Sequence, residues 1–303
     1  MKKALVTGGA GFIGSNLVDT LIRKGIEVWV LDDLSTGNIK NINSKCKFIQ
    51  VDLSCLENLL SIQSQIPVVD VVFHLAAYPE VQHSLDNPTE TNNITTTLNI
   101  LELCRLKKIN RLVFSSSSAV YGNPRYTPID ESHPIQPMSP YALDKKIGED
   151  YCHLYSKIYG VETVCLRYFN VYGKRMKNEG AYKSVISVFK EAHFKGDLLN
   201  IVNDGEQKRD YINVKDIVNA NIRVGNSTTP MKGEIYNVGT GIIYSVNEVA
   251  DMFGDEKKYG EKRLEPNLSL ADNRKIKKLM GWEPTYDLKK WIAKLKTQSK
   301  ILI

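Results

Sequence analysis

The sequence predicts an α/β fold built on a parallel sheet, and three observations support this prediction. Short apolar runs alternate with helical segments along the first half of the chain, a glycine-rich turn joins the first predicted strand to the first helix, and the runs are continuously apolar rather than alternating. Continuously apolar strands are typical of parallel sheets that helices cover on both faces. Because the crossovers are short and such crossovers are right-handed, we expect a doubly wound parallel sheet of the Rossmann type.

The elements that build this sheet follow one another in the first part of the chain. Five prolines within residues 123–140 exclude regular structure there, because proline has no N–H donor and a fixed φ. The expected strands are residues 3–7, 27–31, 47–51, 68–74, 111–114 and 161–167, and the expected helices are residues 12–24, 93–107 and 141–159.

Beyond residue 170 the alternation becomes less regular. Residues 211–224 and 245–252 have the periodicity of helices. We expect residues 1–169 to form the Rossmann-type domain, joined by a later segment at about 210–240. Residues 170–303 are expected to form mainly a smaller C-terminal α/β lobe.

Composition limits the possible partners. Of the 303 residues, 42% are hydrophobic and 24% are charged, and 40 basic against 34 acidic residues give a mild net charge of +6. No apolar run approaches the roughly 20 residues that a membrane-spanning helix needs, and glycines interrupt the apolar segment that follows Lys2 and Lys3, so we expect no signal peptide. The basic residues are accompanied by no nucleic-acid motif and no interleaved aromatics. We therefore expect neither a membrane nor a nucleic acid as partner.

Cysteine and histidine positions argue against disulfides and metals. The five cysteines form no CxxC pair, and the five histidines show no HxH or HxxxH spacing. An odd number of scattered cysteines in a chain of this length indicates reduced, mostly buried thiols, so we expect a cytoplasmic protein. We expect no metal site.

The glycine-rich turn after the first strand predicts a dinucleotide site. Gly8, Gly11 and Gly14 have GxxGxxG spacing and open the first helix. Such glycines permit a tight turn, the close approach of a pyrophosphate and close helix–strand packing, and the helix N-terminus favours the anion. Asp32 follows 18 residues after Gly14, where a carboxylate accepts hydrogen bonds from ribose hydroxyls and repels a 2′-phosphate. This predicts NAD rather than NADP, and the neighbouring Asp33 could share the role.

The end of the third predicted strand is a further candidate for cofactor contact. Asp52 and Leu53 stand there, where the edge of the adenine would lie. The alternative is that Asp52 only caps the helix that begins near Cys55.

A second pattern predicts acid–base chemistry. Ser139 and Pro140 are typical of a helix start, with serine as the N-cap. Tyr141 and Lys145 then lie four residues apart on one helix face, and an ammonium near a phenol favours the phenolate, which could act as a general base. The serines at 115–118 lie at the carboxyl end of a predicted parallel strand, where ligands bind in this fold. One of these hydroxyls is expected to bond a substrate hydroxyl beside Tyr141.

Together these patterns resemble the extended short-chain dehydrogenase/reductase family, in its NAD-dependent nucleotide-sugar epimerase/dehydratase branch, over nearly the whole chain. The resemblance implies a Rossmann-type NAD domain, a lobe that binds a nucleotide sugar, and a homodimer formed through the helices at 93–107 and 141–158. Among its members, the chain is most similar to UDP-N-acetylglucosamine and UDP-glucose 4-epimerases. The matching segments are TGGAGFIGSNL at 7–17, HLAA at 74–77, SSSSAVYG at 115–122, YALDK at 141–145, LRYFNVYG at 166–173, RDYINVKD at 209–216 and YNVGTG at 236–241.

The resemblance also implies roles for single residues. Ser117, Tyr141 and Lys145 match the family's catalytic residues, Ser117 because it stands four residues before Tyr121. Besides Tyr141 and Lys145, the expected cofactor contacts are Gly8, Gly11, Phe12, Ile13, Gly14, Asp32, Asp33, Asp52, Leu53, Leu75, Ala76, Ala77, Asn92 and Tyr168. The expected contacts to a UDP-sugar, besides Ser117 and Tyr141, are Asn170 and Arg209 at the diphosphate, Arg263 as a second clamp, and Ser269 near the 2-substituent of the sugar.

Two positions select among the family's reactions. Dehydratase members have Asp-Glu directly after the catalytic Ser or Thr, whereas this chain has Ser118 and Ala119, so we expect a 4-epimerase that works through a 4-keto intermediate.

Ser269 is small where epimerases of plain hexoses carry Tyr, and a Tyr ring and the acetamido group of a substrate cannot share one close-packed space. This predicts interconversion of UDP-N-acetylglucosamine and UDP-N-acetylgalactosamine, and also of UDP-glucose and UDP-galactose. The alternatives are an epimerase of UDP-glucose or UDP-glucuronate only, a nucleotide-sugar decarboxylase or dehydratase, and, outside the enzymes, a dinucleotide-sensing protein.

Overall fold

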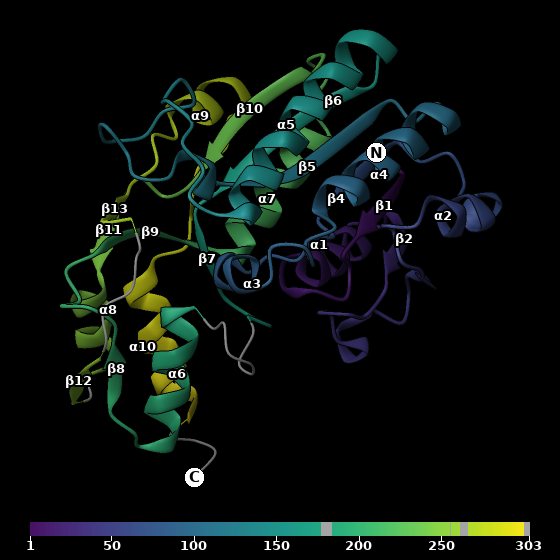
Figure 1. The fold of residues 1–303 in the computed structure, drawn as a ribbon. Coiled ribbons are helices and arrows are strands. Elements are labelled where there is room, and N and C mark those ends of the chain that lie inside the picture. Colours follow the sequence, from purple (N-terminus) through teal and green to yellow (C-terminus); the bar gives the residue numbers. More distant parts are fainter. Residues whose placement is uncertain (177–183, 255, 261–265, 300–303) are drawn as a thin grey trace.

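The computed structural model describes residues 1–176, 184–254, 256–260 and 266–299, and the larger part of these residues surrounds a seven-stranded sheet (Figure 1). The strand order is β10-β6-β5-β4-β1-β2-β3, and every neighbouring pair is parallel. The predicted doubly wound, Rossmann-type sheet is therefore confirmed. The strands are β1 (Lys3–Thr7), β2 (Glu27–Asp32), β3 (Lys47–Gln50), β4 (Val71–His74), β5 (Arg111–Ser117), β6 (Glu162–Tyr168) and β10 (Lys232–Val238).

Helices cover both faces of this sheet because successive strand residues point to opposite faces. Ala4 and Val6 belong to a buried cluster with side chains of α1 and α7, whereas Leu5 belongs to a second cluster with side chains of α2, α4 and α5. The sheet thus has two apolar layers, as continuously apolar strands require. The helices are α1 (Phe12–Arg23), α2 (Leu56–Ile62), α4 (Asn93–Lys107), α5 (Pro140–Tyr159) and α7 (Val214–Gly225), with the short α3 (Val81–Asp86) before α4.

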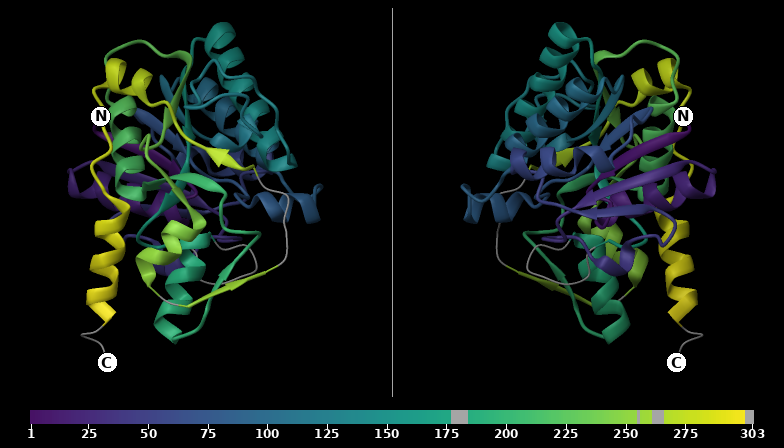
Figure 2. Two further views of the ribbon diagram at one scale, coloured as in Figure 1. Left: turned by 90° about the vertical axis from the view of Figure 1, so that its left-hand side faces the viewer. Right: turned by 90° about the vertical axis from the view of Figure 1, so that its right-hand side faces the viewer.

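A smaller group of elements lies beside the carboxyl ends of the large sheet, at the lower left of Figure 1 and from two further sides in Figure 2. Its central strand is β9, which pairs with β11, β13 and β7, and a separate pair joins β8 to β12. Phe189, Phe253 and Ile292 are fully buried in its core. The elements are β7 (Asn170–Tyr172), β8 (Leu199–Ile201), β9 (Lys208–Asn213), β11 (Ile243–Ser245), β12 (Lys257–Tyr259), β13 (Leu268–Ser269), α6 (Val185–Lys195), α8 (Val246–Phe253) and α10 (Leu288–Ser299), while α9 (Arg274–Met280) packs near β10.

Three element boundaries differ from the prediction by more than one residue. The helix expected at 211–224 begins only at Val214, because the preceding residues belong to β9, and Asn213 caps the helix with its side chain on the N–H of Lys215 (3.0 Å). The strand expected at 68–74 begins at Val71. Strand β5 runs three residues further than predicted, to Ser117, which places Ser117 in register with Tyr168 of β6.

Among the described residues, none of the helices has both the length and the apolar composition that crossing a membrane requires.

Candidate active site

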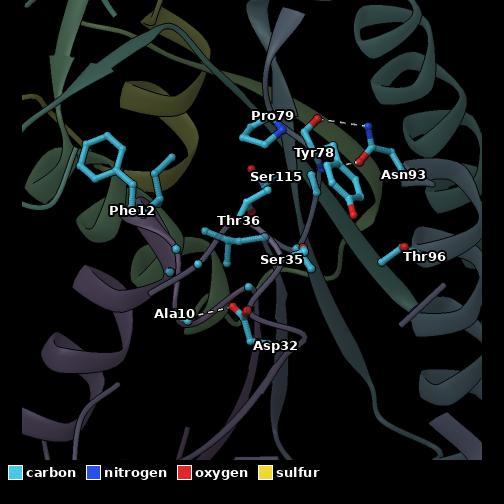
Figure 3. A pocket seen from close by; sticks show the side chains of 18 of the residues that line it. Ala10, Phe12, Asp32, Ser35, Thr36, Tyr78, Pro79, Asn93, Thr96 and Ser115 are labelled. Atoms are coloured by element: carbon cyan, nitrogen blue, oxygen red, sulfur yellow. Dashed lines mark hydrogen bonds between the residues drawn. The ribbon is translucent and has the colours of Figure 1, made fainter. Parts of the chain in front are cut away.

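A cavity of about 780 Å³ opens at the carboxyl ends of the large sheet's strands (Figure 3). This is the edge at which parallel sheets bind ligands. It is lined by all the positions expected to contact the cofactor, namely Gly8, Gly11, Phe12, Ile13, Gly14, Asp32, Asp33, Asp52, Leu53, Leu75, Ala76, Ala77, Asn92, Tyr141, Lys145 and Tyr168. The sequence reasoning missed further lining residues that also follow strand ends or lie near them, among them Ser35, Thr36, Tyr78, Pro79, Asn93 and Thr96.

The glycine turn has a geometry that only glycine permits. Gly8 has a φ of +70°, and a Cβ there would lie 2.7 Å from the backbone nitrogen of Ala76. A Cβ on Gly14 would lie 2.1 Å from the carbonyl oxygen of Gly8. Helix α1 begins after Gly11 without a side-chain cap, and its first residues line the cavity. Its first N–H groups are therefore available to an anion.

Three acids surround one end of the cavity, and one of them is buried. Asp32 accepts hydrogen bonds from the backbone N–H groups of Ala10 and Leu34, both at 2.9 Å, and Figure 3 shows the bond to Ala10. Burial raises the pKa of Asp32. Asp33 and Asp52 instead accept from the serine two residues further on, so Asp52 holds a turn and does not cap α2, whose N-cap is Cys55.

A neutral, buried histidine helps to hold the segment after β4 that lines the cavity. His74 is buried, with Nδ1 2.7 Å from the hydroxyl of Thr7 and Nε2 3.2 Å from that of Thr97. Burial lowers its pKa to about 3, so the ring is uncharged at neutral pH. The Thr7 oxygen also accepts from the N–H groups of Leu75 and Ala76, both at 3.2 Å. This bridge between β1, β4 and α4 holds the chain that follows β4.

Ser117, Tyr141 and Lys145 meet at the cavity. Ser139 caps α5 with its hydroxyl on the N–H of Ala142 (3.2 Å), as predicted, and this places Tyr141 in the first turn. The hydroxyl of Ser117 lies near that of Tyr141 and acts to lower its pKa. Lys145 Nζ lies 5.8 Å from the centre of the Tyr141 ring.

Burial shifts the pKa values of Tyr141 and Lys145 in opposite directions. It raises the pKa of Tyr141, and the nearby Ser117 hydroxyl opposes this only in part. The lysine ammonium donates instead to the carbonyl oxygen of Ser115 (2.8 Å). Burial also lowers the pKa of Lys145 to about 8, against the attraction of Asp144. Desolvation thus decides the direction of both pKa shifts.

The residues expected at the sugar diphosphate lie on the smaller sheet. Arg209 on β9 stands beside Ser269 on β13, and Asn170 on β7 pairs with Tyr211 of the same β9. The amide of Asn170 donates to the carbonyl of Asp210 (3.0 Å). Strand β9 thus brings together three positions that are distant in the sequence. Arg263 lies outside the described residues.

Asp210 is a buried carboxylate that the sequence reasoning did not single out. It accepts hydrogen bonds from the N–H and hydroxyl of Thr240 (2.8 and 2.6 Å) and from the N–H of Gly241 (2.8 Å). Its neighbours Arg209 and Tyr211 are therefore tied to the loop after β10. Asp210 and the loop residues that it binds, Thr240 and Gly241, all lie in the segments that match the family, RDYINVKD and YNVGTG. That match was the sequence signal by which Asp210 could have been found. Within the described part of the chain, no three His, Cys, Asp or Glu side chains gather where they could hold a metal ion.

Comparison with known proteins decides the family. The model of the NAD dependent epimerase/dehydratase family matches residues 4–239. The chain belongs to this family. A protein of Methanocaldococcus jannaschii named putative UDP-glucose 4-epimerase is 42% identical over 300 residues, 96% of either chain. The resemblance inferred from the motifs is confirmed, and with it an enzyme that uses NAD.

Two solved structures are similar over almost their whole length. The UDP-glucose 4-epimerase of Thermotoga maritima with UDP-glucose superimposes with a TM-score of 0.93 at 34% identity, covering 99% of this chain and 100% of the other. The UDP-N-acetylglucosamine 4-epimerase of Methanobrevibacter ruminantium, in complex with UDP-N-acetylmuramic acid, gives a TM-score of 0.89 at 35% identity and covers 99% and 97%. The solved structures similar to this chain thus include proteins named as epimerases of a plain and of an N-acetylated sugar.

Proposed function

We propose that this enzyme is a 4-epimerase that interconverts UDP-N-acetylglucosamine and UDP-N-acetylgalactosamine and also accepts UDP-glucose and UDP-galactose. The observation that carries the proposal is the meeting of Ser117, Tyr141 and Lys145 at a cavity whose other end has the glycine turn and Asp32. Ser118 and Ala119, which follow Ser117, offer no carboxylate for dehydration. The names of the similar proteins support the same reaction.

The cavity fits NAD. The uncapped start of α1 beside Gly11 suits the diphosphate, because free N–H groups point toward an anion there. The fixed carboxylate of Asp32 suits the adenosine ribose. Asp33, Asp52 and Leu53 would surround the adenine, while Leu75, Ala76, Ala77, Asn92 and Tyr168 would lie towards the nicotinamide and the diphosphate. Bound NAD supplies an acceptor that takes a hydride from carbon 4 of the sugar and returns it.

Side chains of α5 and β5 transfer the proton of the sugar 4-hydroxyl. Tyr141 removes the proton of the sugar 4-hydroxyl as carbon 4 loses its hydride, and Ser117 bonds the same oxygen as a relay. Because burial raises the pKa of Tyr141, its work as a base depends on positive charge nearby, and the Lys145 ammonium is such a charge. When the 4-keto sugar has presented its other face and regained the hydride, Tyr141 returns the proton. The overall reaction is therefore an isomerisation.

The smaller sheet would hold the nucleotide during that rotation. Arg209 can pair with two phosphate oxygens through its planar guanidinium, and Asn170 lies on the neighbouring β7. Ser269 stands in register with Arg209, and a small side chain there would leave more room for an acetamido group than a Tyr ring would. This placement is the reason for proposing the N-acetylated pair.

The decisive experiment is product analysis with UDP-glucose, UDP-N-acetylglucosamine and UDP-glucuronate in parallel. We expect 4-epimers of the first two without net change in NAD redox state. The matched control is Tyr141→Phe, which keeps the ring and loses the proton-transfer group. We expect it to lose more than about 1,000-fold in kcat while it retains NAD. A dehydrated or decarboxylated product, or a Tyr141→Phe variant with normal turnover, would contradict the proposal.

We also propose a homodimer formed through α4 and α5. Leu106 on α4 and Leu143, Leu154 and Ile158 on α5 are 43–59% exposed on two helices that pack against each other, and exposed apolar side chains that gather on one surface are typical of an interface. A monomer in light scattering at micromolar concentration would contradict the proposed dimer.

The five free thiols, three of them fully buried, support a reducing compartment such as the cytoplasm.

A further inference from the structure

A buried ion pair lies directly behind the proposed catalytic residues. Arg167 of β6 donates to Glu149 of α5 with both ends of its fork, Nε to Oε1 at 2.8 Å and Nη2 to Oε2 at 2.7 Å. The two side chains are only 2% and 1% exposed. Glu149 lies one helical turn after Lys145, and Arg167 precedes Tyr168. The pair therefore joins the two elements that carry the site's lysine and one wall of its cavity.

The pair also holds the strand end that carries Ser117. Glu149 Oε1 accepts a third hydrogen bond, at 2.6 Å, from the hydroxyl of Ser116. Ser116 stands in register with Arg167, so both side chains project to the same face of the sheet. The carbonyl of the preceding residue, Ser115, accepts from Lys145. Two successive turns of α5 thus fix the backbone on the N-terminal side of Ser117.

On its other side the pair continues toward the smaller sheet. Arg167 Nη1 donates to the hydroxyl of Tyr121 (2.8 Å), which donates to Asn237 Oδ1 (2.7 Å). Asn237 Nδ2 donates to the carbonyl of Ile129 (2.8 Å), and the N–H of Ile129 donates to the carbonyl of Leu270 (2.8 Å). Leu270 directly follows Ser269. One chain of bonds therefore connects the catalytic helix with the strand that carries Ser269.

A second Arg–Glu ion pair, which joins β6 to the neighbouring β5, offers a comparison. Arg111 and Glu162 pair across β5 and β6 at their amino ends, with Nε to Oε2 at 2.9 Å, away from the cavity. Burying an ion pair costs solvation, and an apolar pair of similar volume often stabilises a protein as well or better. Stability alone therefore does not explain why the fully buried pair lies at the carboxyl ends, behind the site.

We propose that Glu149 and Arg167 are positioning residues: through Ser116 and α5 they hold Ser117 and Lys145 in place around the Tyr141 hydroxyl, without touching the substrate. This inference rests on the proposed roles of those three residues. Displacing a proton-transfer group by about 1 Å can cost about 100-fold in rate. Loss of the pair should therefore lower kcat and leave KM nearly unchanged.

The test uses the double variant Glu149→Leu with Arg167→Met, an apolar replacement of similar volume that is expected to fold with a Tm near that of the wild type. We expect kcat to fall about 10- to 100-fold, with the KM for the UDP-sugar and the Kd for NAD within about threefold of the wild type. Glu149→Gln and Glu162→Gln form the matched control, since each removes one carboxylate charge from an Arg–Glu pair that includes a residue of β6. Only Glu149→Gln should lower kcat.

A second readout does not depend on the substrate. The titration of Tyr141 is followed by tyrosinate absorbance as the difference between each protein and its Tyr141→Phe counterpart. We expect the pKa of Tyr141 to rise by about one pH unit in the double variant, because Ser117 no longer donates to it in the same geometry, and to stay unchanged in Glu162→Gln. A double variant that folds with wild-type kcat and an unchanged Tyr141 titration would overturn the proposal. A wild-type enzyme that does not epimerise UDP-sugars would refute the proposed function, while the titration would still decide the positioning role.

Discussion

The two ends of the proposed active site are built in different ways. The NAD end uses the carboxyl ends of neighbouring parallel strands, and its key groups are backbone N–H groups and one buried carboxylate, Asp32. The proposed sugar end consists of Asn170, Arg209 and Ser269, which stand on three strands of the smaller sheet and are not among the residues that line the cavity. The first end is specified by short-range sequence patterns and the second by strand pairing. A substitution at one end should therefore leave the other end's affinity almost unchanged.

The largest expected effect is the loss of activity when Arg209, the proposed contact to the sugar diphosphate, is replaced. Arg209→Ala removes a charged, forked donor, so we expect kcat/KM for the UDP-sugar to fall about 100-fold, since hydrogen bonds to charged groups contribute about 1.5–3 kcal/mol each. Arg209→Lys should recover only part of this loss, because an ammonium cannot form the paired contact. The Kd for NAD, measured by fluorescence titration, should change less than twofold. A parallel loss of NAD affinity would show that the two ends are not independent.

The reciprocal experiment changes the NAD end. Asp32→Ala removes the proposed acceptor of the ribose hydroxyls and the acceptor of the Ala10 N–H, so we expect the Kd for NAD to rise about 10- to 100-fold. The Kd for NADP should also come closer to the Kd for NAD, because no carboxylate then repels the 2′-phosphate. Asp32→Asn is the control that retains an acceptor without the charge. If NADP stays excluded from both variants, Asp32 is not the selecting residue.

A smaller effect is expected within the sugar end. Ser269→Tyr fills the space beside Arg209, and overpacking costs about 1–3 kcal/mol. We expect kcat/KM for UDP-N-acetylglucosamine to fall at least about tenfold more than that for UDP-glucose, whereas Ser269→Ala should change neither. Equal losses for both sugars would refute the acetyl-group selection and leave the epimerase proposal intact.

The smallest effect concerns stability at the NAD end. The pKa of His74 is about 3 in the folded protein against 6.5 as its ordinary value. Between these values the unfolded chain binds the extra proton, so stability is lost as pH falls below about 6.5, by up to about 1.4 kcal/mol per pH unit. His74→Asn should flatten the dependence of Tm on pH between 6.5 and 4.5, measured by calorimetry. An unchanged slope would assign the acid sensitivity to other groups.

Patterns within a few residues sufficed to predict the NAD end. The positive φ of Gly8 and the contact of Gly14 with Gly8 inside the turn require glycine, and the N-cap at Ser139 places Tyr141 and Lys145 on the first turns of α5. Such features depend on backbone conformation and on neighbours along the chain, which sequence spacing records. The doubly wound parallel sheet followed from the alternation of strands and helices, because parallel crossovers leave few topologies.

Only the tertiary structure decided the rest, because burial and long-range pairing have no local signature. The pairing of β9 with β7 makes residues 211–213 a strand although their periodicity indicated a helix. Desolvation decides that His74 is neutral and that burial raises, rather than lowers, the pKa of Tyr141. The fold likewise brings Glu149 and Arg167 together behind the catalytic residues. Charge state and contact depend on what surrounds a side chain in space, and that environment is formed by residues far apart in the sequence.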